Sequence, residues 1–285
     1  MNGRLNRILL YLMAVFLMAG CAAGGSQGEE MLGEIPLVEG EAHITLDSGL
    51  RIDVYELEKP PGIEPLTFVP AAGYSQEEVL SLHEAEREDW FPFDTFFDQT
   101  RSCLSPLPGD RSLAVCGESS ITTDEQGVET GRTMIEVLRD GVILYSADGG
   151  DFSPVFPLRG MWEVDGEWVL EYARITVTVD EAANSAASEA MGQLVWNGVS
   201  LNERDALDEI FGFQLLNGRP FYLFEKGGEI GISFEGQVTM LGFDHVPHYA
   251  CCSAADLNPR PSPNMVSFFA QKAGAWYYVE AGIYE

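Results

Sequence analysis

The sequence is poor in positive charge. It has 16 lysines and arginines against 45 aspartates and glutamates in 285 residues, a formal net charge of -29. Such a surface repels the phosphates of DNA and RNA and the headgroups of anionic lipids. We therefore expect no nucleic-acid partner, and we interpret the acidic excess first as a well-hydrated surface.

The chain also lacks the common catalytic signatures from residue 41 onward. No Gly-x-Ser-x-Gly, His-Glu-x-x-His, phosphate-binding glycine loop or dinucleotide fingerprint occurs there. Because no such motif suggests a reaction, we expect a non-catalytic binding or interaction module without a cofactor. Its ligand, a protein or a small molecule, is not identified by the sequence.

Long apolar runs are absent too, apart from residues 8–18 near the N-terminus, a stretch too short to span a bilayer. Arg4 and Arg7 precede this run, and Ala19-Gly20-Cys21 follows it, which is the layout of a secretory signal. Its removal would also remove the two arginines, leaving a formal charge of about -31.

Residues 17–21 resemble the lipobox of bacterial lipoproteins, with Met18 where leucine is usual. The resemblance implies cleavage before Cys21, a diacylglycerol on its thiol and an acyl chain on its amine, enough lipid for stable anchoring. The alternative is an ordinary secretory signal that ends near a cysteine. We expect the protein at the cell membrane or outer membrane, facing the periplasm or the cell exterior, and touching the membrane through its lipid only.

Three regions follow from this layout. Residues 1–20 form the lipoprotein signal peptide, residues 21–40, rich in glycine and small polar residues, form a flexible tether, and residues 41–285 form a single β-rich extracytoplasmic domain.

With Cys21 assigned to lipid, four cysteines remain, and outside the cytoplasm an even number favours disulfides. A two-residue turn at Gly109-Asp110 would place Cys103 opposite Cys116 across a hairpin. This pairing leaves Cys251 and Cys252 as a vicinal disulfide or as two free thiols.

The segment before these last two cysteines is the best chemical constellation in the chain. His245 and His248 lie close to Cys251 and Cys252, and nitrogen and sulfur are ligands that zinc and copper prefer. The spacing matches no known metal motif, and thiols in an oxidising compartment favour disulfides. We therefore expect a structured loop with hydrogen-bonded His and Tyr side chains, and keep a metal site on these four residues as the alternative.

Most of the chain reads as antiparallel strands joined by tight turns. Alternating apolar residues flank the pairs 140–141, 165–166, 217–218, 227–228, 235–236 and 273–274, each of which contains a glycine. Three of the hairpins repeat an aromatic residue two or three positions after a turn glycine, as in Gly166-Glu167-Trp168. Such degenerate repeats favour a mostly β, antiparallel, propeller-like meander, with a β-sandwich or barrel as the alternative.

Two resemblances accompany this pattern. Residues 104–115 are similar to the Ser-Pro-Asp-Gly-Arg-x-Leu-Ala-Val run of propeller blades of the TolB type, although Leu107-Pro108 intrudes. The C-terminal half contains Pro247-His248-Tyr249-Ala250-Cys251-Cys252-Ser253 and ends in Trp276-Tyr277-Tyr278-Val279-Glu280 before its last five residues. With these two stretches it resembles uncharacterised bacterial secreted proteins. Helix is scarce: a capping box at Ser75 predicts one helix over residues 75–88, and residues 202–210 predict a second.

Two functions from different classes therefore stay open. One is the non-catalytic, membrane-anchored module. The other is an extracytoplasmic metal-binding, redox or hydrolytic enzyme centred on His245, His248, Cys251 and Cys252.

Overall fold

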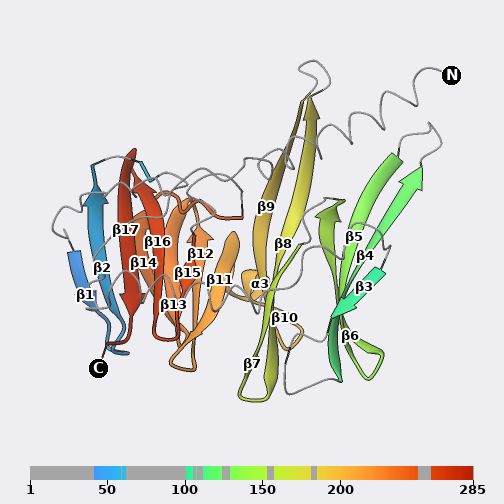
Figure 1. Ribbon diagram of the computed structural model, residues 1–285, viewed down its shortest axis with the longest axis horizontal. Coiled ribbons are helices and arrows are strands. Elements are labelled where there is room, and N and C mark those ends of the chain that lie inside the picture. Colours follow the sequence, from blue (N-terminus) through green and yellow to red (C-terminus); the bar gives the residue numbers. More distant parts are fainter. Residues whose placement is uncertain are drawn as a thin grey trace, which may run out of the picture. The chain divides into compact units, whose positions relative to one another are not determined.

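The structure is a computed structural model, and it describes residues 42–58, 60–61, 101–104, 107, 112–123, 129–152, 157–180, 185–249 and 258–284 (Figure 1). The chain divides into two compact units, each described by itself below. Unit 1 takes its described residues from Phe93–Arg159 and Tyr172–Met191, and unit 2 from Met31–Pro92, Gly160–Glu171 and Gly192–Glu285. The chain passes between them along two long strands, β8 (Glu167–Asp180) and β9 (Ser185–Trp196).

Unit 2 contains a five-stranded and a four-stranded antiparallel sheet. The first has the order β1-β2-β17-β16-β15, with β1 at Ala42–Thr45, β2 at Arg51–Leu57, β15 at Arg260–Pro261, β16 at Met265–Lys272 and β17 at Ala275–Gly282. The second is a simple meander of β11 (Glu209–Leu216), β12 (Arg219–Lys226), β13 (Glu229–Phe234) and β14 (Gln237–Phe243).

The remaining elements of unit 2 lie between β2 and β11 in the chain. They are β7 (Leu158–Val164), the first part of β8, the last part of β9, β10 (Val199–Ser200) and the helix α3 (Leu201–Asp205). The predicted helix over residues 202–210 is shorter than expected. Ser200 caps its start, but Ala206 adopts a left-handed conformation at φ 52° and ends it, and Glu209 already belongs to β11.

Both faces of β12, in the four-stranded sheet, are buried. On β12, Phe221 and Leu223 belong to a core shared with the five-stranded sheet, while Tyr222 and Phe224 belong to a second core with Val169 and Leu194. A strand buried on both faces is apolar at nearly every position, which explains the unbroken run from Phe221 to Phe224.

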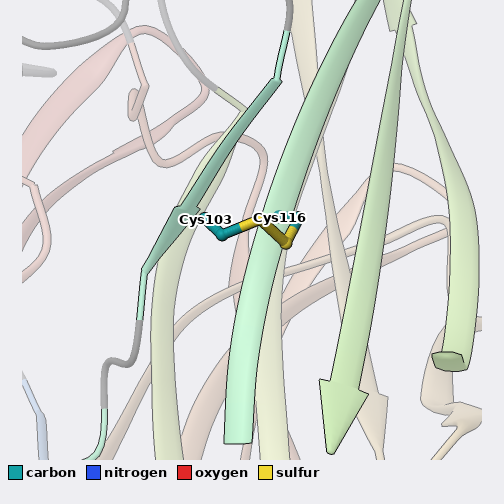
Figure 2. The surroundings of a disulfide bond; sticks show 2 residues. All are labelled: Cys103 and Cys116. Atoms are coloured by element: carbon teal, nitrogen blue, oxygen red, sulfur yellow. A yellow bond between two sulfur atoms is a disulfide. The ribbon is translucent and has the colours of Figure 1, made fainter. Parts of the chain in front are cut away.

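Unit 1 is built around a third meander, β3 (Arg101–Leu104), β4 (Leu113–Thr123), β5 (Glu129–Arg139) and β6 (Val142–Asp151). Cys103 lies directly opposite Cys116 on β3 and β4, and a disulfide joins the two side chains (Figure 2). This is the pairing that the sequence predicts. Its predicted turn at Gly109-Asp110 lies outside the described residues.

Tight turns connect the hairpins where the sequence places them. In the pairs 140–141, 165–166, 217–218, 227–228, 235–236 and 273–274, both residues have positive φ. Positive φ at both central residues is the geometry of a type I′ turn, whose twist matches that of the flanking strands. All six predicted turns are confirmed.

The expected fold class is confirmed: the protein is mostly β, with antiparallel meanders, and the described strands form no closed barrel. The strands of the last meander of unit 2 come from both chain ends, because β2 pairs with β17 along its whole length. Within the described residues, no helix has the length and apolarity needed to cross a bilayer.

The disulfide yields a test of stability. Replacing both Cys103 and Cys116 by serine should lower the free energy of unfolding by about 3 kcal/mol, because the bridge closes a loop with a sequence separation of 13 residues. Urea unfolding of the double variant, compared with the oxidised parent, measures this difference. An unchanged midpoint would contradict the structural role of the bridge.

Candidate functional site

The histidine segment predicted from the sequence follows β14 and is described as far as Tyr249. Its backbone is fixed to β16: the Asp244 amide donates to the Gln271 carbonyl at 2.8 Å, and the Gln271 amide donates to the His245 carbonyl at 2.8 Å. Val246 is fully buried in the core of unit 2. The segment is therefore an ordered part of the unit, whereas Cys251 and Cys252 lie outside the described residues.

His248 is held on three sides. Its ring stacks on Phe211, with centroids 3.6 Å apart and planes 5° from parallel. Nδ1 lies 2.7 Å from the Val246 carbonyl oxygen, and Nε2 lies 3.0 Å from Oε1 of Glu209. Because a carbonyl oxygen can only accept, Nδ1 is the donor in the contact with Val246.

Glu209 has a second partner. Its Oε1 also accepts a hydrogen bond from the backbone amide of Gly192 on β9, at 2.6 Å. A Cβ atom added to Gly192 would lie 2.1 Å from the carbonyl oxygen of Ile210 and 3.0 Å from the hydroxyl of Tyr249. Glycine is therefore required for β9 to approach the first residues of β11 this closely.

Glu171 on β8 is the most enclosed acid of the site, with 3% of its surface exposed. Its two oxygens accept from the amides of Gly212 at 3.0 Å and Phe213 at 2.6 Å, and the Tyr249 hydroxyl donates to Oε1 at 2.5 Å. These two amides lie in a β-bulge, where the register of β11 against β12 shifts between Phe211 and Gln214. The bulge takes them out of the β-ladder, and the carboxylate supplies the acceptors that they need.

We call Glu171, Glu209, His248 and Tyr249 the carboxylate clamp. It ties β8, β9, β11 and the segment after β14 together within unit 2. The expectation of a loop whose His and Tyr side chains are hydrogen-bonded is confirmed for His248 and Tyr249.

His245 differs from its neighbour. His245 is exposed on the surface of unit 2, although part of its ring is shielded from water. This shielding, together with the nearby His248, lowers the pKa of His245 from its ordinary value. The described residues contain no group of three or more His, Cys, Asp or Glu side chains that could hold a metal ion. A set that includes Cys251 and Cys252 lies outside the described part of the chain.

Neither acid of the clamp is predicted from the sequence. Glu171 stands alone in the apolar run Trp168-Val169-Leu170-Glu171-Tyr172, and a lone acid inside a buried strand is the signal that could have identified it. Glu209 carries no comparable signal, because it lies at the very start of β11.

A second polar group, the sheet cluster, lies on the five-stranded sheet. Asp53 on β2 is directly opposite Glu280 on β17, and the two acids are 5% and 0% exposed. Arg51 forms an ion pair with Asp53, with Nε 2.8 Å from Oδ2, and the Tyr278 hydroxyl donates to Glu280 at 2.9 Å. Burial first, and then the negative charges of Asp53 and Glu280, raise the pKa of Tyr55 to about 12.

In unit 1, Asp148 and Asp151 form ion pairs with Arg132, and the carboxylate of Asp151 also accepts from the amide of Val177 at 2.8 Å. Residues 148–151 belong to β6 rather than to a turn. Both aspartates connect strands β5, β6 and β8 instead.

Comparison with known protein families and with curated proteins finds no match to this chain. The clamp and the two other clusters are therefore interpreted from their geometry alone.

The clamp predicts the cost of losing Glu171. Substituting Glu171→Ala leaves two buried amides and a hydroxyl without their acceptor and should destabilise unit 2 by about 3 kcal/mol or more. Glu171→Gln keeps one acceptor oxygen and should cost about half as much. The exposed Glu229→Gln serves as the control and should stay within about 0.5 kcal/mol of the parent in urea unfolding. Equal midpoints for Glu171→Ala and the control would contradict the clamp.

The sheet cluster predicts alkaline sensitivity. Since the pKa of Tyr55 is raised to about 12 in the folded protein, the unfolded chain loses this proton first. The contribution of Tyr55 to the free energy of unfolding is then fully present below about pH 10, and it is lost as the pH rises towards 12. Tyrosinate absorbance followed with pH, together with thermal melts, measures this, and Tyr55→Phe should remove one late-titrating group. A Tyr55 that titrates at its ordinary value would contradict the cluster.

Proposed function

We propose that the protein is a lipid-anchored extracytoplasmic module that binds a ligand or partner without catalysing a reaction. Its place is the cell membrane or the outer membrane, on the side of the periplasm or the cell exterior. The signal layout of residues 1–20 and the lipobox resemblance that ends at Cys21 support the anchor.

The clamp is the observation that carries the non-catalytic role. A general acid or base must present a proton or a lone pair to a substrate. In the clamp, backbone amides and the Tyr249 hydroxyl occupy the oxygens of Glu171, and Glu209 receives Gly192 and His248. These side chains stabilise the arrangement of the strands in unit 2, and this is the work of a rigid support for a binding surface.

Charge limits the ligand. With a formal charge of -29, the surface attracts cationic groups and repels anionic ones. A neutral or basic protein, or a neutral or cationic small molecule, fits this surface better than a phosphorylated or nucleic-acid ligand.

Native mass spectrometry of the protein purified from its own membranes tests the binding role. A stoichiometric added mass supports this role, and turnover of a co-purified molecule contradicts it.

A metal, redox or hydrolytic role centred on His245, His248, Cys251 and Cys252 is the second candidate. It is favoured by His245, which is exposed and whose lowered pKa leaves the ring neutral and able to bind a metal at neutral pH. Against it stands His248, whose two ring nitrogens face Val246 and Glu209.

Thiol counting on the denatured protein, together with elemental analysis, tests the metal-binding form of this candidate. Zero thiols and no metal would remove it. Substituting His245 and His248 together by alanine tests the rest of it, because an unchanged fold and phenotype would leave these residues without a functional role.

The anchor predicts the effect of changing one residue. Cys21→Ser should abolish incorporation of radiolabelled palmitate and release the protein from the membrane fraction, because no thiol remains to receive the lipid. Ala22→Ser, next to the cleavage site, is the matched control and should stay acylated. A Cys21→Ser protein that remains acylated and sediments with membranes would contradict the proposal.

A further inference from the structure

The hairpin of β5 and β6 in unit 1 ends in an unusual tip. All six residues from Arg139 to Leu144 are exposed, and Asp140-Gly141 forms the turn. Three consecutive apolar residues follow the turn: Val142 is 65% exposed, Ile143 52% and Leu144 45%. We call residues 139–144 the hairpin tip.

Two other described hairpins end in polar or small residues. The turn between β12 and β13 exposes Lys226, two glycines and Glu229, and the turn between β13 and β14 exposes Glu235, Gly236 and Gln237. Exposed apolar residues also occur on strand surfaces, as Val238 and Met240 do on β14, and singly beside a turn, as Val199 does after Asn197-Gly198. The hairpin tip is thus a distinct apolar feature of an otherwise strongly acidic chain.

Apolar side chains project from both faces of this tip. Val142 pairs with Arg139 and Ile143 with Leu138, so the two neighbours point to opposite faces of the hairpin. Leu144 follows at a β-bulge, where the register shifts between Val137 and Leu138. A protein surface that docks on a strand covers one face, whereas an apolar medium that surrounds the end of the hairpin covers both. The two-sided apolarity therefore favours a lipid bilayer as the occupant.

We propose that the hairpin tip inserts Val142, Ile143 and Leu144 into the interface of the membrane that carries the lipid anchor. This inference rests on the proposed anchoring at Cys21. Twenty residues separate Cys21 from the start of β1 at Ala42. Even fully extended they reach at most about 70 Å, which keeps the protein close to the bilayer. Confinement at this distance gives a high effective concentration, so three apolar side chains are enough for a contact that would be too weak in free solution.

The charges of the tip agree with a bilayer contact. Arg139 and Asp140 are adjacent and cancel in formal charge, so the tip is locally neutral while the chain carries -29. Because the acidic body is repelled by anionic headgroups, insertion should be strongest in zwitterionic lipid.

The experiment uses the full lipidated protein, reconstituted into phosphatidylcholine vesicles in which part of the lipid carries a photoreactive group on its acyl chain. After irradiation, mass spectrometry should find lipid adducts within residues 139–144 and none within residues 225–229. The triple variant Val142→Ser, Ile143→Ser, Leu144→Ser should float with the vesicles as the parent does, with adduct yield at the tip lowered on the order of tenfold.

The matched control is the double variant Val238→Ser, Met240→Ser, which removes exposed apolar side chains from β14 and should leave the adducts unchanged. Equal thermal melts of the parent and both variants exclude unfolding as the cause. The proposal is overturned if the parent floats with vesicles but carries no adduct at the tip, the result expected for a tip that contacts a protein. It is equally overturned if the triple variant labels as strongly as the parent.

A failure of the anchor gives a different result, because the parent would then not float at all. The mature chain from residue 22, held on nickel-chelating lipid by an N-terminal histidine tag, then repeats the measurement without Cys21. Adducts at the tip in this form support the insertion, and their absence overturns it.

Discussion

The fold of unit 2 depends on a carboxylate that receives two backbone amides. Glu171 on β8 accepts from Gly212 and Phe213 at the bulge of β11. Without the bulge, successive side chains of β11 would alternate strictly, and Phe211 and Phe213 would face the same side. With it, Phe211 joins the core shared with the five-stranded sheet, and Phe213 joins the opposite core with Ile210. One buried acid thus decides which face of β11 each aromatic ring enters.

The energetic logic of this arrangement explains why an acid is buried at all. Enclosing a carboxylate is costly, and an apolar residue of similar size often stabilises a core better. Here an apolar replacement would leave the part-buried amide of Gly212 and the buried amide of Phe213 without their acceptor. If these amides had no acceptor, a regular β11 without the bulge would be favoured. The pairing of β11 with β12 would then shift by one residue. Glu171 therefore stabilises the bulged register, because its carboxylate accepts the hydrogen bonds of the two amides at the bulge.

Features that depend on neighbouring residues can be predicted from this sequence, whereas contacts between distant residues cannot. Turn pairs such as Asp165-Gly166 and Asn217-Gly218 require positive φ at adjacent residues, a property that two neighbouring side chains decide by themselves. The pairing of Cys103 with Cys116 follows from the same local arithmetic. Glu171 and Phe213 are 42 positions apart, so their contact depends on how the meanders pack, which no local pattern encodes. The helix over residues 202–210 was overextended for a related reason: Ile210 is apolar because it enters a core as a strand residue. The predicted helix over residues 75–88, like Cys21, Cys251 and Cys252, falls outside the described residues.

Acidic residues have two different roles in this protein, depending on whether they are buried or exposed. Asp53, Glu171 and Glu280 are buried and engaged with amides, hydroxyls or Arg51, so they contribute to the shape of the sheets. Exposed acids such as Glu229 lie at turns, where their charge is hydrated and acts at long range. A repulsive surface keeps such a protein from settling on an anionic bilayer along its side. Any closer approach must then occur at a place where charge is cancelled and apolar atoms project, and the hairpin tip combines both conditions in six consecutive residues.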